Sequence, residues 1–218
     1  MMHCSVTFRV LIETSLLASL PQESWELLRK VIVEMILATD MSKHFDMMGV
    51  FRGASLGPLD LQTFEERMVL FKMAVKCADV GHAAKETTLH EKWTSKIVEE
   101  FFAQGDLEKE SHLPISIYCD RSSTDISKSQ IGFISAIVQP LFEVLQACLQ
   151  SSAIYEDCVM QLELNMDYWK SKGVKRSNSL SDHNPPEPMN TVASEIDEIK
   201  PLFALSRSKT LIDRKRGV

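Results

Sequence analysis

Residues 87–101, TTLHEKWTSKIVEEF, place Leu89, Trp93, Ile97 and Phe101 at successive steps of four. Side chains four residues apart lie above one another on one face of an α-helix, whereas successive strand residues alternate between two faces. The stretch therefore predicts a helix that begins at Thr87 or Thr88 and carries these side chains along one apolar stripe.

The same helical spacing recurs on both sides of this stretch, and no segment alternates convincingly with period two. We expect further helices that begin at Pro21, after Asp60, near Thr124 and near Ile154, the third of these kinking or restarting at Pro140. Their apolar positions are Trp25, Leu28, Ile32, Met35 and Ile36; Leu61, Phe64, Met68, Phe71 and Val75; Ile126, Phe133, Ile134 and Ile137; and Val159, Leu162, Met166 and Trp169. The predicted fold class is all-α.

Two stretches between these helices, residues 46–59 and 105–123, are rich in turn formers and predict long polar connections. After residue 172 the composition becomes polar and proline-rich, with Phe203 as the single aromatic residue. We expect residues 1–172 to form the folded body and residues 173–218 a mostly disordered polar tail, in which residues 195–205 could form a short helix.

Composition narrows the class of protein. The 218 residues are 44% apolar and 25% charged, which is typical of one globular domain. The 24 Lys and Arg against 30 Asp and Glu leave a net charge of −6, which argues against a nucleic-acid binder. No stretch approaches the roughly 18 apolar residues of a membrane span, and the apolar N-terminal segment contains Glu13 and lacks a basic leader.

The five cysteines lie singly in apolar segments, without the C-x-x-C spacing of zinc or redox sites. We interpret them as reduced packing residues, which predicts a cytoplasmic protein. No H-E-x-x-H pair, glycine-rich phosphate loop or Ser-His-Asp set is visible. Singly, His44, His90 and His112 indicate surface or core residues.

Asp79 breaks the amphipathic pattern. It follows a helical run that is expected to bury Met68, Phe71 and Val75, and it precedes Gly81. A carboxylate at the inner end of such a helix needs a positive partner, which could be a hard cation, an arginine or the N–H groups of a helix end. From spacing alone, a capping aspartate explains the pattern more often than a metal ligand does.

Gln130 and Phe133 form a second candidate group, at positions i and i+3 of an otherwise apolar helix surface. The carboxamide has both a donor and an acceptor for the edge of a heterocycle, and the ring can stack on a flat base. The pair could hold a purine. A core phenylalanine beside a glutamine bonded to the backbone is the more common explanation of the pattern.

Five motifs occur together, in order and with almost no gaps: ILATDMSKHF at residues 36–45, KCADVGH at 76–82, WTSKIVEEFFAQGD at 93–106, CDR at 119–121 and KSQIGFI at 128–134. From about residue 3 to Trp169 the chain resembles the class I 3',5'-cyclic nucleotide phosphodiesterases. The resemblance implies the multi-helix, HD-type phosphodiesterase catalytic fold. It also implies hydrolysis of cAMP or cGMP by two divalent metal ions, Zn²⁺ with Mg²⁺ or Mn²⁺, in signal transduction.

The resemblance also implies roles for single residues. Asp79 matches a metal-ligating aspartate, Gln130 the glutamine that bonds the purine, and Phe133 the ring that stacks on it. The remaining substrate-binding positions are those of Ile97, Phe101, Tyr118, Met41, Thr94, His82 and His3. His82 stands where some subfamilies have asparagine and others histidine.

The family's other metal ligands and its general acid belong to a region N-terminal to any motif found here. We therefore expect a catalytic domain that is truncated at its N-terminus, keeps the base-binding part, lacks the catalytic acid and exposes apolar faces of the helices at Pro21 and Thr87. The cyclic nucleotide is the expected small-molecule partner, and a homodimer is plausible. The alternative is a catalytically incomplete half-domain that binds nucleotide or associates with full-length phosphodiesterase subunits.

Overall fold

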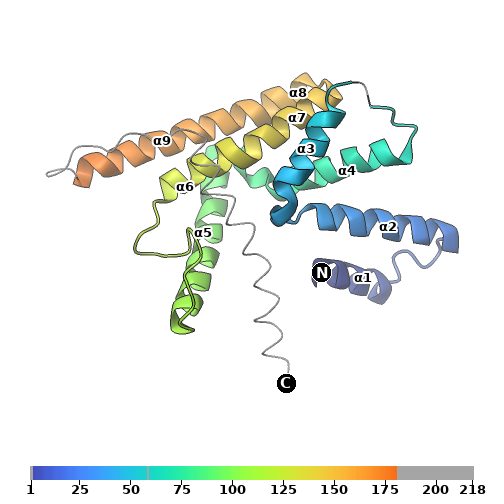
Figure 1. Cartoon of the computed structure of the whole chain (residues 1–218), viewed down its shortest axis with the longest axis horizontal. Helices are drawn as coiled ribbons and strands as arrows, with labels where there is room; N and C mark the ends of the chain where they lie inside the picture. The colour runs from blue at the N-terminus through green and yellow to red at the C-terminus, as the bar shows by residue number, and fades with distance from the viewer. Residues whose placement is uncertain (1, 58, 181–218) are drawn as a thin grey trace. The chain divides into compact units, whose positions relative to one another are not determined.

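The computed structural model describes residues 2–57 and 59–180, which form helices of three types and no strand (Figure 1). The all-α prediction is confirmed for these residues. The chain divides into two compact units, Met1–Asp79 and Val80–Val218.

The first unit is built from four α-helices and a short 3-10 turn, and α2 and α3 both pack on α4. Pro21 directly precedes α2, as expected, because its fixed φ and missing N–H suit a helix start. The elements are α1 Met2–Glu13, α2 Gln22–Ala38, η1 Met41–Lys43, α3 His44–Ala54 and α4 Phe64–Asp79.

Two features of this unit differ from the sequence prediction. Residues 46–54, expected in a polar connection, belong to α3, which buries Met48 and Phe51. Asp60 does not cap α4 directly. Its side chain accepts a hydrogen bond from the Gln62 backbone N–H, and the helix begins at Phe64. Two glycines, Gly49 and Gly53, and the charged residues Asp46 and Arg52 obscured the buried positions of α3.

The buried face of α4 also differs from the prediction. Met68 is buried as expected, but Phe71 is 41% exposed, and Asp79 is exposed at the last residue of the helix. The buried positions are instead Met68, Met73, Lys76 and Cys77. A lysine therefore occupies the core of this unit, where the sequence had indicated only apolar residues.

The second unit contains a 3-10 turn, the long helix α5, and a helical hairpin whose two arms are α6–η3–α7 and α8–η4–α9. Its elements are η2 Gly81–Ala84, α5 Thr87–Glu110, α6 Ile126–Phe133, η3 Ile134–Val138, α7 Gln139–Leu149, α8 Ser152–Ile154, η4 Tyr155–Val159 and α9 Met160–Leu180. The segments η3 and η4 are π-helical turns within longer helices. Helix α9 packs along α6, as Figure 1 shows, and it also contacts α5 and η2.

The stripe on α5 is largely exposed, in agreement with the exposure expected for this helix. Trp93 is 49% and Phe101 41% exposed. The buried side chains are His90 and Thr94, each one position after a stripe residue. One residue corresponds to about 100° around a helix, so α5 packs through a neighbouring, more polar face.

Helix α6 continues through η3 into α7 without a break, from Ile126 to Leu149. These 24 residues are long and apolar enough to cross a membrane, so the expectation that no segment reaches that length is wrong. Ile134, Ile137 and Leu141 are fully buried within the protein. A core helix meets the same criteria, so this is weak evidence for a membrane span. The π-helical turn accommodates Pro140, which leaves the helix unbroken.

Helix α9 extends to Leu180, eight residues past the expected boundary at residue 172. The predicted inward positions of η4 and α9 are largely confirmed, since Val159, Leu162 and Trp169 are buried, while Met166 is half-buried. The rest of the predicted tail, residues 181–218, including the helix considered for residues 195–205, lies outside the described residues.

Candidate functional site

Four rings from four elements of the second unit form a continuous group, here called the ring stack: Phe133 of α6, His82 of η2, His90 of α5 and Trp169 of α9. The His82 ring lies nearly parallel to both Phe133, at 6.1 Å between centroids, and His90, at 5.4 Å. The Trp169 ring meets the edge of His90 at 5.9 Å. The segments that hold the predicted purine residues thus meet at one place.

A buried asparagine holds η2 in this position. The Asn165 side chain on α9 donates hydrogen bonds to the backbone carbonyls of Ala83 and Lys85, both over 2.8 Å. Its Oδ1 accepts a hydrogen bond from Thr87 Oγ1 over 2.7 Å. Because Asn165 is fully buried, these bonds are shielded from water, and they fix the turn that carries His82.

Burial sets the charge of the two histidines. Burial, together with the neighbouring His82 imidazole, lowers the pKa of His90 to about 4. Burial also lowers the pKa of His82. His90 is therefore neutral near pH 7, which matches its role as acceptor from Trp169 Nε1–H at Nε2 over 2.8 Å. A neutral ring stack offers flat surfaces and no charge, and this suits a nucleobase better than a phosphate.

Gln130 lies on α6 about one helical turn before Phe133, and its side chain is 9% exposed. Its Oε1 accepts a hydrogen bond from the Thr94 hydroxyl on α5 over 3.3 Å. The structure thus brings together Gln130 with Thr94 and Phe133 with His82, four of the residues predicted for the substrate.

The other predicted residues of this unit lie on α5 and in the connection that follows it. Ile97 is half-buried and Phe101 exposed. Tyr118 lines an open pocket of about 510 Å³. That pocket is formed by residues 115–128, including Lys128, and its lining contains neither Gln130 nor Phe133.

The predicted residues of the first unit do not form a comparable group. His3 lies exposed on α1, and Asp79 lies exposed at the end of α4. Met41 in η1 is half-buried and contacts Lys76, whose Nζ lies 3.5 Å from its Sδ and 3.3 Å from the Ala38 carbonyl oxygen. Burial lowers the pKa of Lys76, while the charges of Asp79 and Asp40 raise it. The positive group that interacts electrostatically with Asp79 is therefore the ammonium of Lys76.

The described residues do not fit a pair of metal ions. Within residues 2–57 and 59–180, no three His, Cys, Asp or Glu side chains gather to hold one ion. A hard cation such as Mg²⁺ needs about six oxygen ligands, and Asp79 alone offers two oxygens.

Sequence patterns missed three residues that organise these sites. His90 and Trp169 had been assigned only to packing, and Lys76 to no role. Each faces its partner through a long-range contact, 79 residues along the chain for His90 and Trp169 and 38 for Lys76 and Ala38. The one local signal was the pair of polar residues His90 and Thr94, at i and i+4 on one face of α5, and it could have indicated His90.

Comparison with known proteins identifies similar chains. A family model described as 3'5'-cyclic nucleotide phosphodiesterase matches residues 1–159. A Drosophila melanogaster protein named dual specificity calcium/calmodulin-dependent 3',5'-cyclic nucleotide phosphodiesterase 1 is 41% identical over 150 residues, which cover 68% of this chain and 18% of that protein. A 3',5'-cyclic-AMP phosphodiesterase isoform F from the same organism is 34% identical over 178 residues, covering 78% and 27%.

The solved structure of LmjPDEB1 in complex with IBMX superimposes with a TM-score of 0.74 at 25% sequence identity. The match covers 80% of this chain and 52% of that one. The chain thus spans about half of the solved structure and between 18% and 27% of the two curated relatives. The fold and the sequence agree on the same group of proteins.

Proposed function

Because the chain belongs to the 3',5'-cyclic nucleotide phosphodiesterase family, we propose that it provides the purine-binding part of an enzyme that hydrolyses cAMP or cGMP to the 5'-monophosphate. Gln130 bonds the edge of the base, and Phe133 stacks on its face. His82 supports the ring of Phe133, and Thr94 supports the carboxamide. The observation that carries this proposal is the meeting of Gln130, Thr94, Phe133 and His82 in one unit.

The partner of Gln130 bears on the choice of nucleotide. A threonine hydroxyl both donates and accepts, so Thr94 can donate to Oε1 or accept from Nε2 if the amide turns over. Adenine and guanine present opposite donor and acceptor patterns at this edge. We therefore expect the site to accept both cAMP and cGMP, with Ile97, Phe101 and Tyr118 as apolar walls.

Family membership implies two divalent ions, zinc with magnesium or manganese, at the phosphate. Asp79 is the residue of this chain that we assign to them. Met41 and His3, which also belong to the first unit, are assigned to substrate binding. The metal ions would supply charge stabilisation and an activated water, and the residues described here bind and orient the base.

A second function is favoured by one specific observation, the lack of a metal-binding group among the described residues. In that alternative the chain binds nucleotide, or associates with full-length phosphodiesterase subunits, without turnover. A homodimer and a cytoplasmic location remain predictions under both functions.

Equilibrium binding of cAMP and cGMP to the 218-residue chain tests the proposal. We expect saturable binding of both nucleotides, and Gln130→Ala should weaken it by on the order of 1 to 3 kcal/mol because a buried base edge loses its hydrogen bonds. Gln139→Ala is the matched control, since Gln139 lies on the same continuous helix and bonds only its neighbour Glu143 among the contacts described. Equal loss in both variants contradicts the role of Gln130.

Hydrolysis measured with added Zn²⁺ and Mg²⁺ separates the two functions. Binding without turnover supports the alternative, whereas turnover that Asp79→Ala abolishes supports the enzyme. Nucleotide affinity should be unaffected by Asp79→Ala, because that carboxylate serves the metal ions and not the base. Loss of nucleotide binding in Asp79→Ala contradicts the separation of the two roles.

A further inference from the structure

The connection between α5 and α6, residues 111–125, returns along the C-terminal half of α5. Connections of this length without secondary structure are uncommon in compact domains and are usually functional or disordered. This one is tied to α5 at three places. Together these ties hold a residue that is predicted to bind the substrate.

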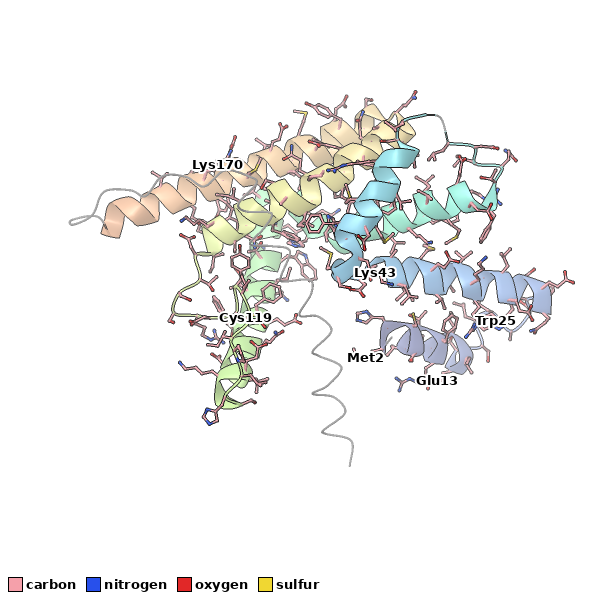
Figure 2. The ribbon with its side chains drawn as sticks, viewed as in Figure 1. Met2, Glu13, Trp25, Lys43, Cys119 and Lys170 are labelled. Carbon is pink, nitrogen blue, oxygen red and sulfur yellow. The ribbon has the colours of Figure 1, made fainter. Side chains whose placement is uncertain are left out.

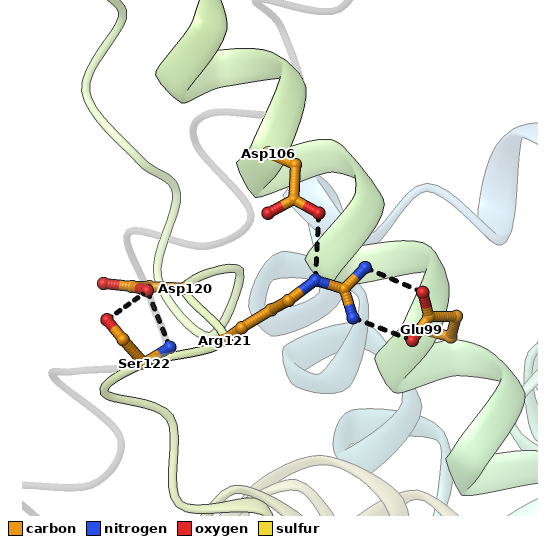
Figure 3. A network of polar contacts seen from close by, with 5 residues as sticks. All are labelled: Glu99, Asp106, Asp120, Arg121 and Ser122. Atoms are coloured by element: carbon orange, nitrogen blue, oxygen red, sulfur yellow. Dashed lines mark hydrogen bonds and ion pairs between the residues drawn. The ribbon is translucent and has the colours of Figure 1, made fainter.

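The first tie is Arg121, whose guanidinium lies between two carboxylates of α5 (Figure 3). Nη1 and Nη2 donate to the two oxygens of Glu99 over 2.9 and 2.7 Å, and Nε donates to Asp106 over 2.9 Å. The guanidinium also lies 5.2 Å from the centre of the Phe102 ring. Arg121 therefore uses both edges and one face of its planar group, which a lysine cannot do.

The second tie is Glu108, near the end of α5. Its carboxylate accepts hydrogen bonds from the Ser116 backbone N–H over 2.7 Å and from the Ser116 hydroxyl over 2.8 Å. Gln104, one turn earlier, donates to the same carboxylate over 2.8 Å. The connection is thus held on the near side of residue 118 as well as on the far side.

The third tie is a close backbone approach at Gly105. A Cβ atom on this glycine would lie 2.0 Å from the carbonyl oxygen of Cys119. Figure 2 shows Cys119 against α5. Only a residue without a side chain allows the connection to lie this close to the helix.

Tyr118 lies between these ties and has a φ of 62°. A bulky aromatic residue in the left-handed region is an outlier, and such strain persists only where the surroundings over-determine it. The neighbouring Ser116, Cys119 and Arg121 provide that constraint. The strained backbone places Tyr118 in the wall of the 510 Å³ pocket.

We propose that Arg121 is a positioning residue, which clamps residues 116–121 onto α5 and so holds Tyr118 in the conformation that lines the 510 Å³ pocket of residues 115–128. The proposal rests on the proposed function, because it assigns Tyr118 to the bound nucleotide. Single exposed ion pairs contribute little, but a bidentate pair with a second carboxylate and a ring forms a network. Glu99 and Asp106 hold the segment through Arg121, whereas Glu108 holds it through Ser116.

Two substitutions test the clamp. Arg121→Gln removes the charge and the fork, and Arg121→Lys keeps the charge but cannot reach Glu99 twice and Asp106 at once. Arg9→Gln is the control, because Arg9 is an exposed arginine of α1. Since Arg121 is itself exposed, the melting temperature should change by only a few degrees in each variant.

Amide hydrogen exchange measures directly how firmly Arg121 holds the segment against α5. The Ser116 amide donates to Glu108 of α5, and the amides of Cys119 and Thr124 donate to the carbonyls of Ser116 and Asp120 within the segment. In Arg121→Gln we expect their exchange to quicken by about tenfold, with a smaller increase in Arg121→Lys and none in Arg9→Gln. A merely stabilising ion pair would not select these amides.

Equilibrium binding of cAMP and cGMP tests whether the position of Tyr118 affects nucleotide affinity. We expect Arg121→Gln to weaken nucleotide affinity by roughly three- to tenfold while the melting temperature changes by only a few degrees, with partial recovery in Arg121→Lys. Unchanged exchange in Arg121→Gln overturns the clamp. Faster exchange with unchanged affinity overturns the positioning of Tyr118. If the unaltered chain binds no nucleotide, the proposed function fails, and the exchange experiment alone decides whether Arg121 clamps the segment.

Discussion

The indole N–H of Trp169 donates a hydrogen bond to Nε2 of His90 over 2.8 Å, and both side chains are buried. Because a neutral imidazole carries one proton, this bond assigns that proton to Nδ1. The bond joins α5 to α9 and holds the inner end of the ring stack. His90 and Trp169 therefore support His82 and Phe133 without touching the proposed nucleotide.

Removing this donor should destabilise the fold. Trp169→Phe keeps most of the ring but leaves Nε2 of His90 without its donor, which should lower the free energy of unfolding by about 1 to 3 kcal/mol. Trp93→Phe is the control, since Trp93 is 49% exposed, and it should change stability by less than about 0.5 kcal/mol. Urea denaturation measures both. Equal effects of the two substitutions would contradict the importance of the buried bond.

The buried histidines should make stability depend on pH. The pKa of His90 is lowered to about 4 in the folded chain from an ordinary value of 6.5, and that of His82 is lowered too. The unfolded chain thus binds these protons more tightly. The contribution of His90 is complete above pH 6.5 and is lost as pH falls toward 4, with a slope of up to about 1.4 kcal/mol per pH unit, and that of His82 is lost in the same direction.

His90→Gln keeps an acceptor for Trp169 but does not titrate, so the slope between pH 6.5 and 4.5 should become shallower. His112→Gln, at an exposed position of the connection after α5, should keep the slope of the unaltered chain. Denaturant unfolding at several pH values measures it. If the free energy of unfolding of His90→Gln varies with pH with the same slope as in the unaltered chain, the prediction is wrong.

The close approach at Gly105 should not tolerate a side chain. Gly105→Ala places a methyl group against the Cys119 carbonyl, at 2.0 Å before any shift, so the connection must move away from α5. We expect a loss of about 1 to 3 kcal/mol, as for overpacked cores. Gly49→Ala is the matched control in helix α3, where nothing lies within 4 Å, and it should stabilise by roughly 0.5 to 1 kcal/mol. Thermal unfolding of both variants gives the comparison, and a loss in both would point to a cause other than the close approach.

The buried Lys76 should contribute little net stability. Lys76→Met keeps the packing of the stem and removes an ammonium whose burial lowers its pKa. We expect the free energy of unfolding at pH 7 to change by less than about 1 kcal/mol, because the lost bond to Ala38 is offset by relief of desolvation. Lys76→Ala should instead cost about 2 to 5 kcal/mol through a cavity. A large loss in Lys76→Met would show that the charge itself stabilises this unit.

The helices could largely be predicted from the sequence, because periodicity is a local property. Leu89, Trp93 and Ile97 at steps of four marked α5, and Val159, Leu162 and Trp169 marked the inward face of α9. The prediction failed at α3, whose glycines and polar residues interrupt its pattern. Helix formation there is decided by packing on α4.

The amino-acid sequence by itself determined the fold class, the family motifs and the candidates Gln130 and Phe133. Only the tertiary structure decided which polar groups meet: Trp169 with His90, Thr94 with Gln130, and Arg121 with Glu99. The physical reason is that helical spacing acts over four residues, whereas these hydrogen bonds join residues 22 to 79 positions apart. Their formation depends on how whole helices pack, and this cannot be read from the pattern of any one of them.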